Sequence, residues 1–181
     1  MLEALKNKIR YTKFHYFILW FTNPEYIKWI KEEINFHSKF LKESRLIFDL
    51  GANRGDKTHV FKRFAEKVIL YEPENKMYKI LKNRFKFSNV KINNILISNK
   101  VGISKFLSVK NKEAYSSLIY KSISNLNIKM NDINIKKKKS STLNKEIEKY
   151  GAPDYIKIDC EGAEYMILKN LKYKINLISV E

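Results

Sequence analysis

The sequence predicts an α/β fold, a mostly parallel sheet with helices on both faces, preceded by a two-helix N-terminal extension. Two segments carry this prediction, residues 46–64 and 155–168, because each has a short apolar strand followed by a turn and an apolar-periodic helix. Residues 68–71 add a third apolar strand, which ends in an acid and a proline. We therefore expect residues 1–44 to form the extension and residues 45–181 to form one domain.

Composition limits the class of protein. With 44% hydrophobic residues, the 181-residue chain can bury the core of one domain. The single cysteine, Cys160, excludes an internal disulfide framework and favours a reducing, cytoplasmic location. The formal net charge of +17 suits an anionic partner, but the basic residues are scattered along the whole chain. We therefore favour compositional drift over a nucleic-acid surface, and nucleic acid is not the expected partner.

The N-terminal extension is predicted to contain two helices. The first ends near Asn23, because a residue before proline disfavours helix, and the second runs from about Pro24 to Lys42. The apolar run at residues 16–21 is far shorter than the ~20 residues that span a bilayer. Its basic and aromatic composition allows peripheral membrane contact, but packing on the domain core is the favoured interpretation.

The first chemically informative segment is Leu-Ile-Phe-Asp-Leu-Gly-Ala-Asn-Arg-Gly-Asp at residues 46–56. Five residues form a buried strand, and the glycines Gly51 and Gly55 then flank Asn53 before a helix begins. Glycines let the backbone turn sharply and approach a ligand, and main-chain N–H groups at a helix start can hold an anionic group. This segment is typical of the opening of a nucleotide-binding βαβ unit.

Glu72 supports the same interpretation. It ends the next predicted strand and lies 21 residues after Gly51, and an acid at about 20 residues is placed to bind ribose hydroxyls. The alternative is a structural turn followed by an ordinary capping acid. Neither the third glycine of a dinucleotide fingerprint nor a Walker lysine follows the turn. We favour nucleotide-type binding.

The middle of the chain is predicted to continue the α/β pattern. Residues 90–97 form the third strand, and Gly102 suggests a hairpin with the strand that follows it. The four lysines at 136–139 are interpreted as a solvated strand edge or loop, although they could also bind an anionic acceptor. A helix is expected at residues 143–150, ended by Gly151.

A second chemical segment follows at residues 155–164. Asp159 falls at the carboxyl end of a predicted buried strand, where open α/β sheets bind ligands. Lys157 lies among apolar residues and needs a partner, for which Asp159 or Glu161 is the candidate. Glu161 is expected to begin the next helix and to share a face with Glu164. The acids could instead bind a divalent metal, but their spacing does not demand it, and no metal ligand is assigned.

Three motifs together resemble the FkbM-type methyltransferases. They are Phe-Asp-Leu-Gly-Ala-Asn-Arg-Gly at 48–55, Tyr-Glu-Pro at 71–73, and Tyr-Ile-Lys-Ile-Asp-Cys-Glu-Gly-Ala-Glu at 155–164. The resemblance covers residues 46–181. It implies a Rossmann-like class I methyltransferase domain that uses S-adenosyl-L-methionine (SAM) as cofactor for O-methyl transfer.

The resemblance also gives the polar residues their expected roles. The expected cofactor-binding residues are Asp49, Gly51, Asn53, Gly55, Glu72 and Asn94, the last beside the adenine. The expected catalytic residues are Asp159, Glu161 and Lys157. Asp159 could contact the cofactor's amino group or orient the acceptor, and Glu161 or Lys157 could assist its deprotonation; the sequence does not choose among these roles.

The last predicted strand, residues 175–180, would be an exposed apolar edge, because the family's two further strands do not follow it in this sequence. We expect this unfinished edge to be covered by a second copy, another partner or the N-terminal helices. The leading hypothesis is methyl transfer to a hydroxyl of a sugar, glycan or small metabolite. A truncated domain that binds SAM or a partner without turnover is the first alternative. A nucleic-acid methyltransferase is the second, but the Asn/Asp-Pro-Pro-Tyr/Phe signature of amino-methylating enzymes is absent.

Overall fold

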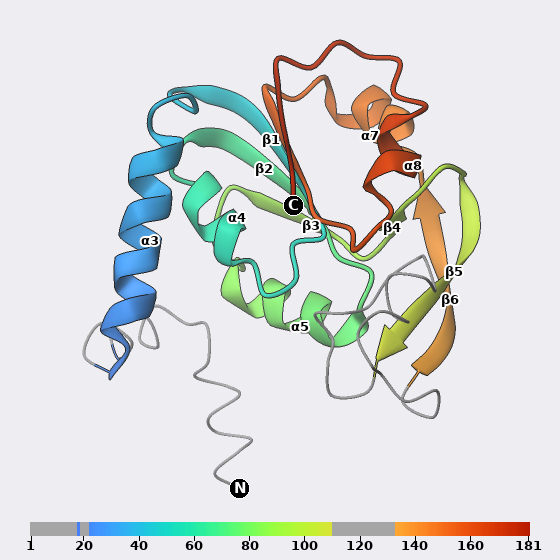
Figure 1. The fold of residues 1–181 in the computed structure, drawn as a ribbon, viewed down its shortest axis with the longest axis horizontal. Coiled ribbons are helices and arrows are strands. Elements are labelled where there is room, and N and C mark those ends of the chain that lie inside the picture. The colour runs from blue at the N-terminus through green and yellow to red at the C-terminus, as the bar shows by residue number, and fades with distance from the viewer. Residues whose placement is uncertain (1–17, 19–21, 110–132) are drawn as a thin grey trace, which may run out of the picture.

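A five-stranded parallel sheet forms the centre of the fold (Figure 1). The computed structural model describes Ile18 and residues 22–109 and 133–181, so most of the first predicted N-terminal helix lies outside these residues. In spatial order the strands are β3 (Val90–Asn93), β2 (Ala65–Tyr71), β1 (Ser44–Leu50), β7 (Tyr155–Ile158) and β8 (Leu177–Val180). The predicted mostly parallel sheet is confirmed.

The strand order creates a switch point between β1 and β7. From β1 the chain moves outward through β2 to β3, and it later returns to the other side of β1 at β7. In open parallel sheets, ligands bind at the carboxyl ends of the strands beside such a reversal. The register brings Asp49 of β1 directly beside Lys157 of β7, and Leu50 beside Ile158. The two predicted chemical segments therefore meet at one edge of the sheet.

Helices cover both faces of the sheet, as predicted. They are α3 (Pro24–His37), α4 (Asp56–Phe61), α5 (Asn75–Arg84), α7 (Leu143–Tyr150) and α8 (Glu164–Leu168). Because successive side chains of a strand point to opposite faces, Ile47 packs with residues of α3 and α4, whereas Phe48 packs with residues of α7 and α8. α5 packs against Leu70 through Leu81 and Phe85.

The N-terminal extension contributes α3 to this packing. Asn23 caps α3 by accepting a hydrogen bond from the Tyr26 amide at 3.0 Å, and the Tyr26 hydroxyl donates to Asp56 of α4 at 2.8 Å. α3 ends at His37, earlier than the predicted Lys42, because the chain then turns so that Leu41 is buried with Ile47. No helix within the described residues is long and apolar enough to cross a membrane. Peripheral membrane contact stays a prediction.

A second, three-stranded sheet corrects two predictions about the middle of the chain. Its strands are β4 (Leu96–Ile97), β6 (Ile133–Ser141) and β5 (Gly102–Val109), with β6 in the middle. The predicted third strand at 90–97 is therefore two strands in different sheets. The predicted hairpin at Gly102 was wrong, because β5 pairs antiparallel with β6 rather than with β4. The four lysines lie in the part of β6 that pairs with β5 on one side only, because β4 reaches no further than Ser140 and Ser141. The predicted strand edge is therefore confirmed, but it is not solvated throughout, because Lys138 is buried.

The turn after β1 depends on a close approach that only glycine allows. Gly51 has a φ of 74°, and a Cβ there would overlap the main-chain carbonyl oxygen of Asp159. Gly51→Ala should therefore lower the free energy of unfolding by more than ~3 kcal/mol, as measured by urea denaturation. Gly102→Ala is the matched control, because Gly102 also has positive φ but no atom lies within 4 Å of the position that a Cβ would take there. Its loss should stay near ~1–2 kcal/mol, and equal losses would contradict a special role for the Gly51 contact.

Candidate functional site

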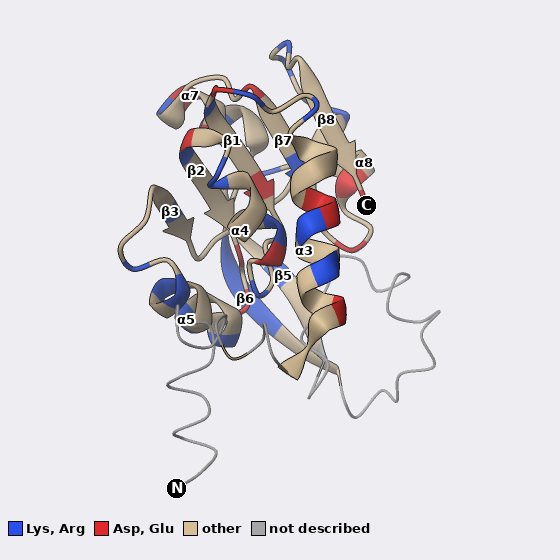
Figure 2. Ribbon diagram, turned by 90° about the vertical axis from the view of Figure 1, so that its left-hand side faces the viewer, with Lys and Arg blue, Asp and Glu red and all other residues tan. Residues whose placement is uncertain are grey.

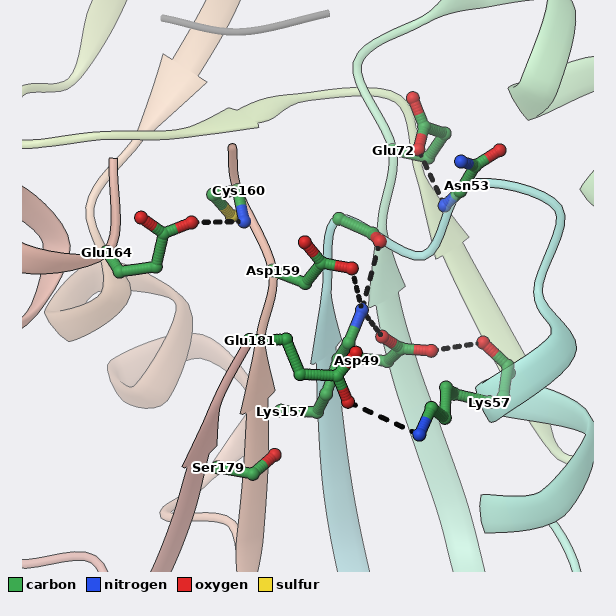
Figure 3. Close-up of polar contacts among 12 residues, drawn as sticks. Asp49, Asn53, Lys57, Glu72, Lys157, Asp159, Cys160, Glu164, Ser179 and Glu181 are labelled. Carbon is green, nitrogen blue, oxygen red and sulfur yellow. Dashed lines mark hydrogen bonds and ion pairs between the residues drawn. The ribbon is translucent and has the colours of Figure 1, made fainter. Parts of the chain in front are cut away.

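The candidate site lies at the carboxyl ends of β1, β2 and β7 (Figure 3). Asp49 is the penultimate residue of β1, and the loop 51–55 follows that strand. Glu72 directly follows β2, Asn94 directly follows β3, and Asp159 directly follows β7. Parallel strands that start on one side of the sheet also end on one side, so the ends of four strands place polar groups at the same edge of the sheet.

The centre of the site is the buried ammonium group of Lys157. It donates hydrogen bonds to Asp159 Oδ2 at 3.1 Å and to the Gly51 carbonyl oxygen at 3.2 Å, and it lies 3.7 Å from Asp49 Oδ1. Only 3% of the Lys157 side chain is exposed. Burial alone would lower the pKa of Lys157, but the carboxylates of Asp49 and Asp159 outweigh it and raise the pKa. Lys157 therefore stays charged, and this favours a positioning role.

Asp49 is the fully buried partner of this ammonium. Its other oxygen accepts a hydrogen bond from the hydroxyl of Thr58, the third residue of α4. Burial raises the pKa of Asp49 above its ordinary value, and the charge of Lys157 and the Thr58 hydroxyl oppose that rise. Asp159 is a partner of Lys157, as predicted, whereas the contacts of Asp49 with Lys157 and with Thr58 were not predicted. The pairing of β1 with β7 reveals Asp49, and the position of α4 at the end of β1 reveals Thr58.

Glu72 lies on the other side of the loop 51–55. Its Oε2 accepts a hydrogen bond from the Asn53 amide at 2.8 Å, and its Oε1 accepts one from the Glu74 amide at 2.7 Å. Only 6% of Glu72 is exposed. Burial raises the pKa of Glu72 to about 7, although the two amide hydrogen bonds act against the rise. Asn94 extends this group, because its Nδ2 donates to the Glu72 carbonyl oxygen at 2.8 Å.

The loop itself is held in shape by left-handed backbone. Gly51, Asn53 and Gly55 all have positive φ, between 49° and 79°. A side chain at Gly55 would collide with Leu81 of α5 and with Phe85, which directly follows that helix, so this glycine lets the loop pack against the end of α5. The main-chain amide of Asn53 then points at the Glu72 carboxylate (Figure 3). The two halves of the predicted ligand site thus contact each other directly.

Comparison with known families matches residues 49–181 to the methyltransferase FkbM domain. The chain belongs to this family. The match begins at Asp49 and includes every residue of the site described above. The resemblance seen in the sequence is therefore confirmed, and the α/β fold agrees with it.

Solved structures give more distant likenesses to this FkbM domain. The methyltransferase FkbM of Methylobacillus flagellatus is 18% identical over 70% of this chain and 28% of that one, with a TM-score of 0.46. A SAM-dependent methyltransferase of Leishmania major is also 18% identical, over 50% of this chain and 37% of that one, with a TM-score of 0.34. The chain thus spans well under half the length of either structure. A search of curated proteins finds no match.

The structure corrects the prediction for Glu161. The FkbM domain begins α8 at Glu164, so Glu161 precedes the helix, and the two acids do not share a helix face. Glu161 and Gly162 both have positive φ, which turns the chain before the helix can start. Glu164 Oε1 accepts hydrogen bonds from the amides of Cys160 and Gly162 at 2.8 and 3.1 Å. Glu161 is half-buried, and burial followed by the charges of Asp159 and Glu164 raises its pKa.

Two further features bear on the chemistry of the FkbM domain. Among the residues that the structure describes, no group of three or more histidine, cysteine, aspartate or glutamate side chains is placed to hold a metal ion. Cys160 packs against the core cluster on the α7 and α8 side, and burial raises the pKa of its thiol.

Removing the charge of Lys157 should lower the stability of the fold, because the buried Asp49 carboxylate loses its counter-charge. Lys157→Met leaves the Asp49 carboxylate buried without its cation, so the free energy of unfolding should fall by ~3–5 kcal/mol. The double variant Asp49→Asn/Lys157→Met has no buried charge pair and should recover part of that loss. Urea denaturation at pH 7 measures both, with Lys91→Met on the exposed edge of β3 as a control for lysine removal. A double variant less stable than Lys157→Met would contradict charge pairing as the cause.

The raised pKa of Glu72 predicts a pH dependence of stability. Glu72 keeps its proton to about pH 7 in the folded chain but releases it near 4.5 when unfolded. Its contribution to stability is therefore full below pH 4.5 and is lost as pH rises through 7. Between pH 4.5 and 8, the unfolding free energy of the wild type should fall by up to ~3 kcal/mol more than that of Glu72→Gln, whose amide does not titrate.

The Glu72 comparison isolates one group, because Asp49 titrates in both proteins. Urea denaturation at several pH values gives the two curves. Parallel curves for the wild type and Glu72→Gln would show that Glu72 has an ordinary pKa.

Proposed function

We propose that this FkbM domain binds SAM at the carboxyl ends of β1 and β2 and transfers its methyl group to a hydroxyl of a sugar, glycan or small metabolite. The observation that carries the proposal is the Glu72 carboxylate, which is buried at the end of β2 and hydrogen-bonded to the glycine-rich loop. Family membership supports the reaction class. The acceptor and the oxygen specificity are parts of the proposal.

The residues present fit a nucleoside ligand. A carboxylate has about four acceptor positions, and the Asn53 and Glu74 amides use two of those on Glu72, so ribose hydroxyls can donate to the others. Asn94 follows β3 and donates to the Glu72 carbonyl oxygen, and this neighbourhood supports its assignment to the base of the nucleoside. The loop 51–55 and Asp49 close the other side, where Lys157 balances the buried charge.

The chemistry asks for positioning and for the removal of one proton. SAM supplies a methyl group already activated on a sulfonium, so the chain must align an acceptor hydroxyl and accept its proton. Asp159 is one-third exposed and its carboxylate is held by Lys157, which suits it to orient the hydroxyl. Glu161 lies two residues further on, is half-buried and has a pKa raised by burial, which suits it to accept the proton of the acceptor hydroxyl. In this proposal Lys157 positions Asp159 and transfers no proton.

Thermal unfolding with SAM or S-adenosylhomocysteine tests the cofactor site. A ligand at 100 times its Kd adds ~2.7 kcal/mol of stability, which should raise the Tm by roughly 5 to 10 °C. Glu72→Ala should lose most of this shift, and Glu72→Gln should weaken it while preserving side-chain volume. Glu66→Ala is the matched control, because Glu66 is an exposed acid of the same strand.

Two outcomes would contradict the cofactor assignment. One is a folded wild-type protein whose Tm does not respond to either ligand. The other is a full response in both Glu72 variants. If the response is lost only at Glu72, methylation of a panel of sugars and small hydroxyl compounds with radiolabelled SAM tests the transfer itself.

A further inference from the structure

A groove of about 570 Å³ lies between the three-stranded sheet and α8, outside the residues assigned to SAM. Three lysines line it, Lys100, Lys105 and Lys137, together with the apolar side chains of Ile103 and Met166. Met166 comes from α8, and Lys105 and Lys137 come from β5 and β6. Its volume is within the range of small-molecule sites, about 300–1,000 Å³. The groove thus has three positively charged side chains and two apolar side chains among its lining residues.

The four lysines follow one another along β6 (Figure 2), and strand alternation divides them into two groups. Lys136 lies 3.0 Å from Glu74, and Lys138 donates to the Asn75 side chain at 2.7 Å, so both serve the contact of β6 with the start of α5. Lys137 points to the opposite, exposed face, where the groove lies. Lys136 and Lys138 therefore stabilise the contact with α5, whereas Lys137 makes no such contact and can bind a ligand.

Lys137 is also paired with another lysine. Lys105 of β5 is its direct partner in the antiparallel register, so two positive side chains lie opposite each other. Like charges in this position destabilise a sheet. In the described part of the chain, no carboxylate forms an ion pair with Lys100, Lys105 or Lys137. Among the described residues, the groove thus keeps three lysine charges without a carboxylate partner, and the Lys105–Lys137 pair destabilises the sheet. This is the arrangement expected of an anion-binding site.

We propose that this groove binds a phosphate or similar oxyanion group of a small polar molecule, and that this molecule is the methyl acceptor. The second part rests on the proposed function. It is supported by the chain connections, because β4 begins two residues after Asn94 and α8 begins five residues after Asp159. The segments that end at the candidate cofactor and catalytic residues thus continue into the walls of the groove. The acceptor class is then a phosphorylated or otherwise anionic sugar.

Isothermal titration of the full chain with glucose 6-phosphate, inorganic phosphate and glucose tests the groove directly. Glucose 6-phosphate should bind most tightly, inorganic phosphate more weakly, and glucose not measurably. The double variant Lys105→Gln/Lys137→Gln should bind glucose 6-phosphate at least tenfold more weakly, while its Tm stays equal or rises because the like-charge pair is gone. If Lys105 and Lys137 only stabilised the fold, the double variant would instead have a lower Tm than the wild type.

Lys79→Gln/Lys91→Gln is the matched control, because it removes the same charge from exposed positions on α5 and β3. Equal weakening in both double variants would show a general effect of net charge and would overturn the site. Binding only to phosphatidylglycerol vesicles, or only to a single-stranded oligonucleotide, would overturn the small-molecule assignment.

SAM titration of the same samples separates the two proposals. A retained SAM response with no glucose 6-phosphate binding overturns the groove alone. Glucose 6-phosphate binding that depends on Lys105 and Lys137, without any SAM response, leaves the anion site standing and overturns the proposed methyl transfer, and with it the acceptor role of the ligand.

Discussion

The buried ammonium of Lys157 is the interaction on which the rest of the site depends. It joins the ends of β1 and β7 by binding Asp159, lying near Asp49 and donating to the Gly51 carbonyl oxygen. A buried charge is tolerated only when it is paired and hydrogen-bonded, so these groups must fold together or leave a costly charge behind. Gly51 completes the arrangement, since any larger residue would separate the loop from the Asp159 carbonyl. The glycine-rich loop and the segment after β7 are therefore one structural unit.

Much of this site was predictable because its signals are local in sequence. A strand, a glycine turn and an acid at the end of the next strand can be recognised without knowing the strand order, so Gly51, Gly55, Glu72 and Asp159 all lie where the sequence placed them. The pairing of Asp49 with Lys157 could not be seen, because it depends on β1 and β7 being neighbours across more than a hundred residues. The roles of the site residues in binding and catalysis stay predictions.

The remaining errors have physical causes that are equally specific. The acids at 161 and 164 have the spacing of a helix first turn, but the left-handed backbone of Glu161 and Gly162 delays the helix to Glu164. The lysines at 136–139 were predicted to be solvated because four consecutive charged residues show no alternation of polar and apolar side chains. In β6, long stems and polar partners such as Glu74 and Asn75 let half of these lysines turn inward.

Charge and pKa values suit Lys157, Glu72 and Glu161 to three different roles at this end of the sheet. Lys157 is held as a cation between two carboxylates, so it can fix geometry but releases no proton near neutral pH. Glu72 and Glu161 both have raised pKa values, yet they lie on opposite sides of that cation, one beside the loop 51–55 and the other beyond β7. Glu72 is enclosed by amide donors, which suits binding, whereas Glu161 is only half-buried, which suits proton transfer with an entering molecule. Under the proposed function, SAM would lie on the Glu72 side of Lys157, towards β2, and the acceptor would enter on the Glu161 side, beyond β7.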